Sequence, residues 1–103
     1  MKLTGKQKRF LRANANHLRP IFSVGKNGLN ELWLNEVNQA VDSRELVKIS
    51  IQQSADVDTD DVKEFIENNS DISVVQTIGK TVLLFNQSSN PKHRDISNCV
   101  FIL

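Results

Sequence analysis

The stretch that decides the fold is residues 21–28, which read Ile21-Phe22-Ser23-Val24-Gly25-Lys26-Asn27-Gly28. The first four residues are typical of a short strand, and the two glycines that follow favour a turn. From residue 29 to residue 43, apolar residues return at helical spacing. We therefore expect a strand, a turn and a helix in succession, and such a crossover helix requires some parallel strand pairing.

The rest of the chain predicts two more helices and three more strands. Thr4 and Gln7 fit a capping box that begins a first helix, and Pro20 disfavours helical geometry beyond Leu18. The predicted fold class is α/β (α+β), with a mixed four-stranded sheet packed with three helices. After residue 28 come a helix over residues 29–43, a strand over residues 46–52, a helix opened by Asp58, Asp60 and Asp61, and hairpin strands over residues 72–78 and 81–85.

Apolar faces of these elements supply the expected core. In the first helix, helical spacing separates Leu3, Phe10, Leu11, Ala15 and Leu18 from the basic residues Lys2, Lys6, Lys8, Arg9 and Arg12 on the opposite face. The second helix is expected to bury a broad side made of Leu29, Leu32, Trp33, Val37, Ala40 and Val41. In the strand over residues 46–52, Val47, Ile49 and Ile51 face one way, and Lys48, Ser50 and Gln52 face the other.

The distribution of charge is the most informative feature of the composition. Residues 1–28 hold seven Lys and Arg and no acidic residue, whereas residues 29–103 hold six basic and all twelve acidic residues. The formal charges of the two parts are therefore +7 and −6, although the whole chain carries only +1. A local positive field attracts polyanions whatever the total charge. The alternative reading is that the basic helix is merely solvated.

The four residues Gly25, Lys26, Asn27 and Gly28 combine the properties of an anion-binding loop. Glycines let a backbone approach closely, Lys26 adds a flexible cation, and the amides of a following helix can hold an anion. KH domains clamp nucleotide backbones with a GxxG loop of this kind. Taken alone, the motif is better explained by a plain strand-to-helix turn. The acid-free basic helix, expected beside it, reverses that preference and favours the nucleic-acid reading.

Other motifs do not indicate a nucleotide-binding, metal or catalytic site. Gly79-Lys80-Thr81 resembles the end of a phosphate-binding P-loop. However, position 74 is Val where the P-loop requires its first glycine, and the motif lies between strands instead of before a helix. His17, His93 and Cys99 are too scattered for a zinc site, and no nucleophile–base constellation can be assembled. We therefore expect neither an enzyme nor a cofactor, metal or small-molecule substrate. The six aromatic residues mostly occupy core positions, Trp33 included, so recognition should rest on phosphate and shape rather than base stacking.

Several sequence blocks, in this order and spacing, carry a family resemblance. They are Leu3-Thr4-Gly5-Lys6-Gln7-Lys8-Arg9, Leu18-Arg19-Pro20, Val24-Gly25-Lys26-Asn27-Gly28-Leu29, Glu45-Leu46-Val47-Lys48 and Ile78-Gly79-Lys80-Thr81-Val82-Leu83. Together they resemble the YhbY-type CRM domain (chloroplast RNA splicing and ribosome maturation) over roughly residues 1–95. The resemblance implies a fold similar to the C-terminal domain of bacterial translation initiation factor three, with a KH-like GxxG loop. Free-standing bacterial members of this family associate with precursors of the large ribosomal subunit, and the resemblance implies the same for this chain.

By this resemblance, the expected RNA-binding residues are Gly25, Lys26, Asn27 and Gly28 in the loop, Lys6, Lys8, Arg9 and Arg12 on the first helix, and Arg19, with Lys2, Arg44 and Lys80 as secondary candidates. The expected partner is rRNA of a large-subunit precursor. The chain departs from the family pattern after Arg94 and ends in an apolar tail, Cys99-Val100-Phe101-Ile102-Leu103. For residues 96–103 three states remain open: disordered, packed on the body, or sticky between molecules.

The sequence therefore predicts a cytoplasmic, monomeric RNA-binding factor that assists ribosome assembly. The lone Cys99 fits a reducing compartment, and neither a signal peptide nor an apolar run long enough to span a bilayer is found. Two other readings remain. One is a protein-interaction module whose basic helix docks on an acidic ribosomal or assembly protein. The other is a DNA-binding role, which phosphate attraction alone does not distinguish from RNA binding.

Overall fold

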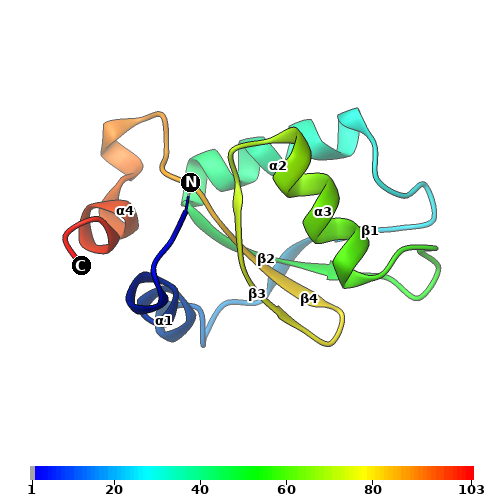
Figure 1. The fold of residues 1–103 in the computed structure, drawn as a ribbon. Helices are drawn as coiled ribbons and strands as arrows, with labels where there is room; N and C mark the ends of the chain where they lie inside the picture. The colour runs from blue at the N-terminus through cyan, green and yellow to red at the C-terminus, as the bar shows by residue number, and fades with distance from the viewer. Residues whose placement is uncertain (1) are drawn as a thin grey trace.

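The computed structural model describes residues 2–103, which form one mixed sheet with helices on both of its faces (Figure 1). The elements in chain order are α1 (Gly5–Asn14), β1 (Pro20–Val24), α2 (Glu31–Arg44), β2 (Leu46–Ile51), α3 (Thr59–Asn69), β3 (Ser73–Ile78), β4 (Thr81–Phe85), a 3-10 turn (Pro91–His93) and α4 (Asp95–Val100). The predicted order of the first seven helices and strands is confirmed. The short helix α4 is additional.

The sheet has the strand order β1-β2-β4-β3. β1 pairs with β2 in parallel, as the crossover through α2 requires, and the other two pairings are antiparallel. A row of facing residues at one end of the strands runs Ser23, Ser50, Thr81 and Ile78. The predicted mixed four-stranded sheet is therefore confirmed, together with its closing hairpin.

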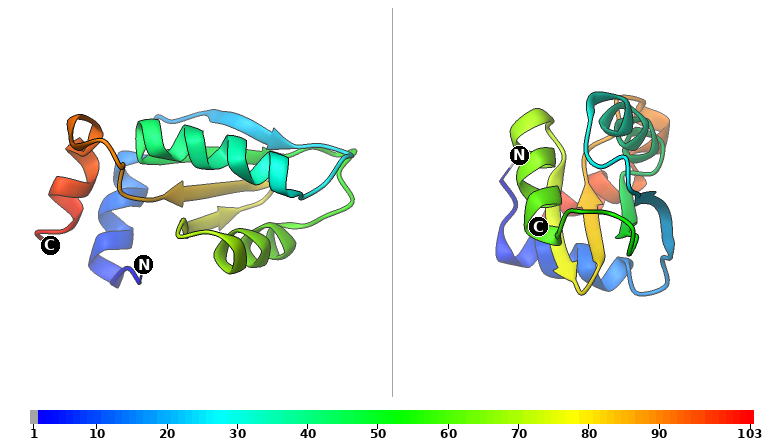
Figure 2. Two further views of the ribbon diagram at one scale, coloured as in Figure 1. Left: turned by 90° about the horizontal axis from the view of Figure 1, so that it is seen from above. Right: turned by 90° about the vertical axis from the view of Figure 1, so that its right-hand side faces the viewer.

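The helices divide between the two faces of the sheet (Figure 2). α2 and α3 cover one face, where Val47, Ile49 and Ile51 of β2 pack with the buried side of α2. On the other face, α1 and α4 pack at one end only, over Leu46, Leu83 and Phe85. Each fully buried aliphatic or aromatic side chain in these clusters stabilises the fold by roughly 1.5–3 kcal/mol. Within the described residues, no helix covers the remainder of that second face.

Two helix boundaries differ from the sequence prediction. α1 ends at Asn14 rather than near Leu18, because the chain tightens into turns with a hydrogen bond from the amide of Leu18 to the carbonyl of Ala15. α2 begins at Glu31 rather than residue 29, because the Asn30 side chain accepts a hydrogen bond from the amide of Trp33 and acts as the cap.

The predicted buried side of α2 was wrong at one position. Leu32 is 71% exposed, whereas Leu34, which was not predicted, is buried. The helix turns residues 33, 34, 37 and 41 toward the sheet, and Leu32 then falls outside that arc. Trp33 is buried as predicted, and its indole Nε1 donates to the backbone carbonyl of Ser23 at 3.0 Å.

The C-terminal residues pack on the body through a buried carboxylate. Glu45 ends α2 with a left-handed φ of 65° and is completely buried. Its side chain accepts hydrogen bonds from the amide of Ser88, and from both the amide and the hydroxyl of Ser97 in α4, at 2.6–2.9 Å. Val100 is fully buried, while Phe101, Ile102 and Leu103 are exposed. Of the states left open for the tail, residues 96–100 are therefore packed.

Candidate nucleic-acid interface

The 25–28 loop (Gly25, Lys26, Asn27 and Gly28) is a tight turn at the end of β1. The amide of Gly28 donates to the carbonyl of Gly25 at 3.0 Å, and Gly28 has a φ of +71°. An L side chain rarely adopts that backbone conformation, so the turn requires glycine there. Lys26 and Asn27 occupy the tip and are exposed. The turn therefore presents a cation and an amide side chain directly to solvent.

Gln52, the residue that follows the end of β2, holds the base of this loop. The amide of Gln52 donates to the carbonyl of Val24 at 2.9 Å, and its side-chain Nε2 donates to the hydroxyl of Ser23 at 2.9 Å. A Cβ at Gly25 would lie 3.1 Å from Oε1 of Gln52, so glycine there allows the close approach. The loop is thus fixed at its base and free at its tip, which suits a backbone-binding turn.

A groove of about 440 Å³ runs between the 25–28 loop and the first turn of α2. It is lined by the loop itself, by Phe22, Ser23, Gln52 and Asn30, and by Leu32, Trp33 and Glu36 of α2. Asn30 already accepts from an amide of the α2 N-terminus, and Glu31 adds an acid to the first turn. The exposed loop, rather than the N-terminus of α2, is therefore the part of this groove suited to an anion.

The turn between β3 and β4 lies at the same edge of the sheet. The carbonyl of Lys80 accepts from the amide of Ile51, the last residue of β2, at 2.8 Å. Gln52, the next residue, bonds to Val24 at the end of β1. Lys26 and Lys80 therefore follow strand ends on the two sides of β2, and the fold brings these two predicted residues to one edge.

The basic helix α1 lies at the other end of the sheet. It packs on Leu46, the first residue of β2, and on Phe85, the last residue of β4. The loop instead follows Val24, which pairs with Ile51 at the far end of β2. A six-residue strand spans about 20 Å, and Figure 2 shows α1 and the loop region separated along the long direction of the molecule. The expectation that the helix lies beside the loop was wrong.

The basic residues near this end of the sheet form two groups. The first belongs to α1 and the residues before it: Lys6 and Arg9 are exposed, Arg12 is half-buried, and Lys2 and Lys8 line a hollow together with Glu67 of α3. The second lies at the start of β1, where Arg19, Arg44 and Lys48 line a small hollow. Nζ of Lys48 donates to the carbonyl of Leu18 at 3.1 Å. Lys48 was missed as a site candidate, although its outward position in the strand pattern was a usable signal.

The acidic residues gather on a different layer from α1 and the strands. None lies in α1 or in the four strands. Nine of the twelve lie in α2, in α3 or in the segment that leads into α3, and another is the buried Glu45. The charge asymmetry of the sequence is thus an asymmetry in space, with the acidic residues concentrated on the layer of α2 and α3.

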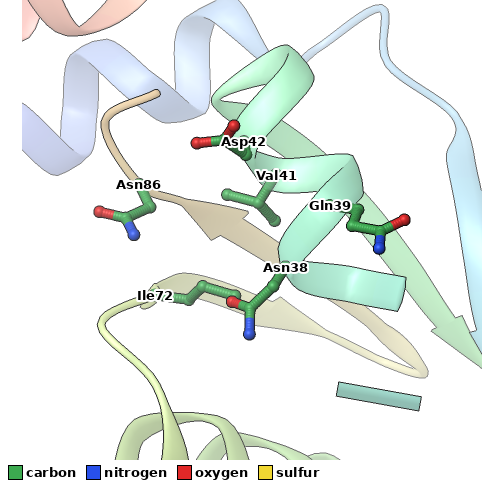
Figure 3. Close-up of a pocket in the computed structure, with 6 residues that line it drawn as sticks. All are labelled: Asn38, Gln39, Val41, Asp42, Ile72 and Asn86. Atoms are coloured by element: carbon green, nitrogen blue, oxygen red, sulfur yellow. The ribbon is translucent and has the colours of Figure 1, made fainter. Parts of the chain in front are cut away.

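Another hollow beside α2 offers no proton donor at neutral pH. It measures about 330 Å³ and is lined by Asn38, Gln39, Val41, Asp42, Ile72 and Asn86 (Figure 3). Asp42 accepts hydrogen bonds from the amide and the hydroxyl of Ser89 at 2.7 and 2.8 Å, and these bonds lower the pKa of its carboxyl. An ionised carboxylate occupied in this way does not act as a proton donor at neutral pH.

Two other kinds of site are also not found in the described part of the chain. Among residues 2–103, no group of three or more His, Cys, Asp or Glu side chains could hold a metal ion. Over the same residues, no helix is long and apolar enough to cross a bilayer.

Comparisons with known proteins agree with one another. A family model described as the CRS1 / YhbY (CRM) domain matches residues 3–86. The chain is 45% identical over 94 residues to “Probable RNA-binding protein YqeI” of Bacillus subtilis, a match that covers 91% of this chain and 98% of that protein. It is 37% identical over 94 residues to an “RNA-binding protein” of Haemophilus influenzae, covering 87% and 91%. A Staphylococcus aureus protein solved in solution matches with a TM-score of 0.67 and 36% identity, covering 91% and 98%.

Proposed function

The chain belongs to the CRS1/YhbY (CRM) domain family, as its sequence blocks predicted, and on that premise we propose that it binds structured RNA through the 25–28 loop. The observation that carries the proposal is the loop itself, a glycine turn fixed at its base by Gln52 with Lys26 and Asn27 exposed at its tip. The relatives named as RNA-binding proteins support RNA as the polyanion.

The RNA we propose is rRNA in precursors of the large ribosomal subunit, in line with the resemblance to free-standing YhbY-type proteins. The chain acts there by positioning RNA during assembly, without catalysis. Lys26 provides a flexible cation, while the backbone of the turn can approach a phosphate closely because Gly25 and Gly28 have no side chains. Lys80 lies at the same edge and extends the positive field. Cytoplasmic location and a monomeric state are parts of this proposal.

Basic residues at the other end of the sheet provide a second phosphate-binding surface in this proposal. Lys6 and Arg9 are exposed on α1, and Arg19 lies near Arg44 and Lys48 at the start of β1. Arg12 and Lys8 are partly exposed, and Lys2 lies at the edge near α3. Because this surface is about one strand length away from the loop, it contacts a different part of the same RNA.

The test of the loop is the double variant Lys26→Asp/Asn27→Asp. Binding to a large-subunit rRNA fragment should weaken by at least tenfold, because Lys26→Asp reverses a charge that faces phosphate and Asn27→Asp adds a negative one. The matched control is Lys63→Asp/Asn35→Asp, because both residues are exposed on the acidic helices α3 and α2. Thermal unfolding should be nearly unchanged in both variants. Undiminished RNA binding by a folded loop variant would rule out the proposed role of the loop.

The ribosomal target is tested separately in cells. The protein should sediment with large-subunit precursors and should leave that fraction after complete ribonuclease digestion. If it stays with the particle proteins after digestion, the contact is with a protein, and the proposal of an RNA target is wrong.

A further inference from the structure

The face of the sheet opposite α2 and α3 is open between α1 and the 25–28 loop. Strand alternation places Lys48 and Ser50 on the same face as Leu46, which packs against α1. Thr81 shares that face with Leu83 and Phe85 in β4. All three of Lys48, Ser50 and Thr81 remain partly exposed, although they lie in the two central strands. A central sheet face left open in this way is available to a ligand.

A row of hydroxyl groups crosses this open face beside the loop. Ser23 faces Ser50, and Ser50 faces Thr81, so the three side chains come from β1, β2 and β4 at one level of the sheet. Ser23 precedes Gly25 by two residues and accepts from Gln52. Among residues 2–103, the hydroxyls of Ser50 and Thr81 form no hydrogen bond. These two groups are therefore free to donate to and accept from a bound molecule.

The surroundings of the hydroxyl row match the chemistry of a ribose–phosphate backbone. The face carries Lys48, and Lys80 lies in the hairpin turn at the end of the row, while none of the four strands contains an acidic residue. Two aliphatic side chains here are unusually exposed: Ile78, which faces Thr81 at the end of the row, at 60%, and Ile21, which lines the hollow with Lys48, at 44%. Exposed apolar groups next to hydroxyls and cations suit a sugar, which has both C–H surfaces and hydroxyl groups.

We propose that the RNA strand held by the 25–28 loop continues across the row Ser23, Ser50 and Thr81, and that the hydroxyls of Ser50 and Thr81 contact ribose 2′-hydroxyl groups. The inference rests on the proposed function and deepens it, because it assigns the preference for RNA over DNA to two named residues. A 2′-hydroxyl can both donate and accept, and it is the group by which a protein distinguishes RNA from DNA. The loop and the cations contact phosphates, which the two nucleic acids share.

The experiment compares one RNA hairpin with its 2′-deoxy counterpart, in which deoxyuridine replaces uridine, at matched salt. The wild-type protein should prefer the RNA. In Ser50→Ala/Thr81→Val, the ratio of RNA to DNA affinity should fall on the order of tenfold, from the loss of two hydrogen bonds. Binding of the deoxy hairpin should change less than about twofold. The salt dependence should keep its slope, because no charge is altered.

Two control variants make the result specific. Ser43→Ala/Thr77→Val removes one hydroxyl from the exposed side of α2 and one from the other face of β3, and should leave the affinity ratio unchanged. Ser50→Thr/Thr81→Ser keeps both hydroxyls and should retain most of the preference. An unchanged ratio in folded Ser50→Ala/Thr81→Val, or a wild-type protein without preference for RNA, would overturn the inference. Neither result would contradict the proposed RNA-binding role of the loop. That role is contradicted only if Lys26→Asp/Asn27→Asp binds the RNA hairpin normally.

Discussion

The two ends of the sheet are built in opposite ways. At one end, the 25–28 loop is fixed at its base by a few polar contacts and exposes its tip. At the other end, α1, α4 and the buried Glu45 form a second core around Leu46 and Phe85. Loops positioned on a rigid scaffold commonly carry function, whereas buried networks specify the fold. The comparison separates residues whose replacement should affect binding from those whose replacement should affect stability.

The largest effect is expected at the core end, from Glu45→Ala. The substitution leaves the amides of Ser88 and Ser97 without their buried acceptor, at a cost of about 1–3 kcal/mol each. We expect a loss of several kcal/mol in the free energy of unfolding and faster proteolysis after residue 86. Denaturant unfolding measures the first effect. Glu36→Ala, at an exposed position of the same helix, should change stability by less than about 0.5 kcal/mol.

The next effect distinguishes one RNA contact surface from two. Lys6→Ala/Arg9→Ala removes two exposed charges from α1, and should weaken binding of a long structured RNA on the order of tenfold at low salt. A short oligonucleotide that reaches only the loop should bind as before, because α1 lies at the other end of the sheet. Fluorescence anisotropy with RNAs of increasing length measures the difference. Equal losses for short and long RNA would mean that α1 and the loop act as one site.

Much of the difference between the two ends of the sheet could be predicted from the sequence, because it depends on local patterns. Thr4 and Gln7 form the predicted capping box, and Asp58 caps α3. The strand from residue 46 onward follows its predicted alternation, and the strand from residue 81 to residue 85 closes the predicted hairpin. The loop's exposure also follows from its composition. These features depend on neighbours within a few residues of each other in the chain.

The features that could not be predicted depend on contacts between distant residues. Nothing near Glu45 in the sequence indicates that Ser88 and Ser97 will surround its carboxylate. The side of α2 that faces the sheet is set by packing, so Leu32 and Leu34 could not be told apart by spacing alone. The distance between α1 and the loop depends on how the chain returns at Pro20 and on which strand β1 joins.

A smaller effect is expected from the backbone of the loop. Gly28→Ala places an L side chain at a φ of +71° and should cost about 1–2 kcal/mol, although nothing lies within 4 Å of the added Cβ. Gly5→Ala is the matched control, since Gly5 also has open space but lies at the start of α1 without a positive φ. That control should be neutral or slightly stabilising. Thermal unfolding of both variants tests whether strain, rather than space, requires glycine at position 28.

The smallest effect concerns Asp42, which joins α2 to the segment that leads into α4. The hydrogen bonds from Ser89, supported by the charges of His93 and Arg94, hold the pKa of this carboxyl below its ordinary value of 3.8. A lowered folded-state pKa means that the stabilisation is complete above pH 3.8 and disappears as the pH falls through the lower folded value. Asp42→Asn should therefore flatten the fall in stability below about pH 4, measured by thermal unfolding against pH. Asp60→Asn, at an exposed position of α3, should leave that profile unchanged; an identical profile for Asp42→Asn would show that the C-terminal segment is held by Glu45 alone.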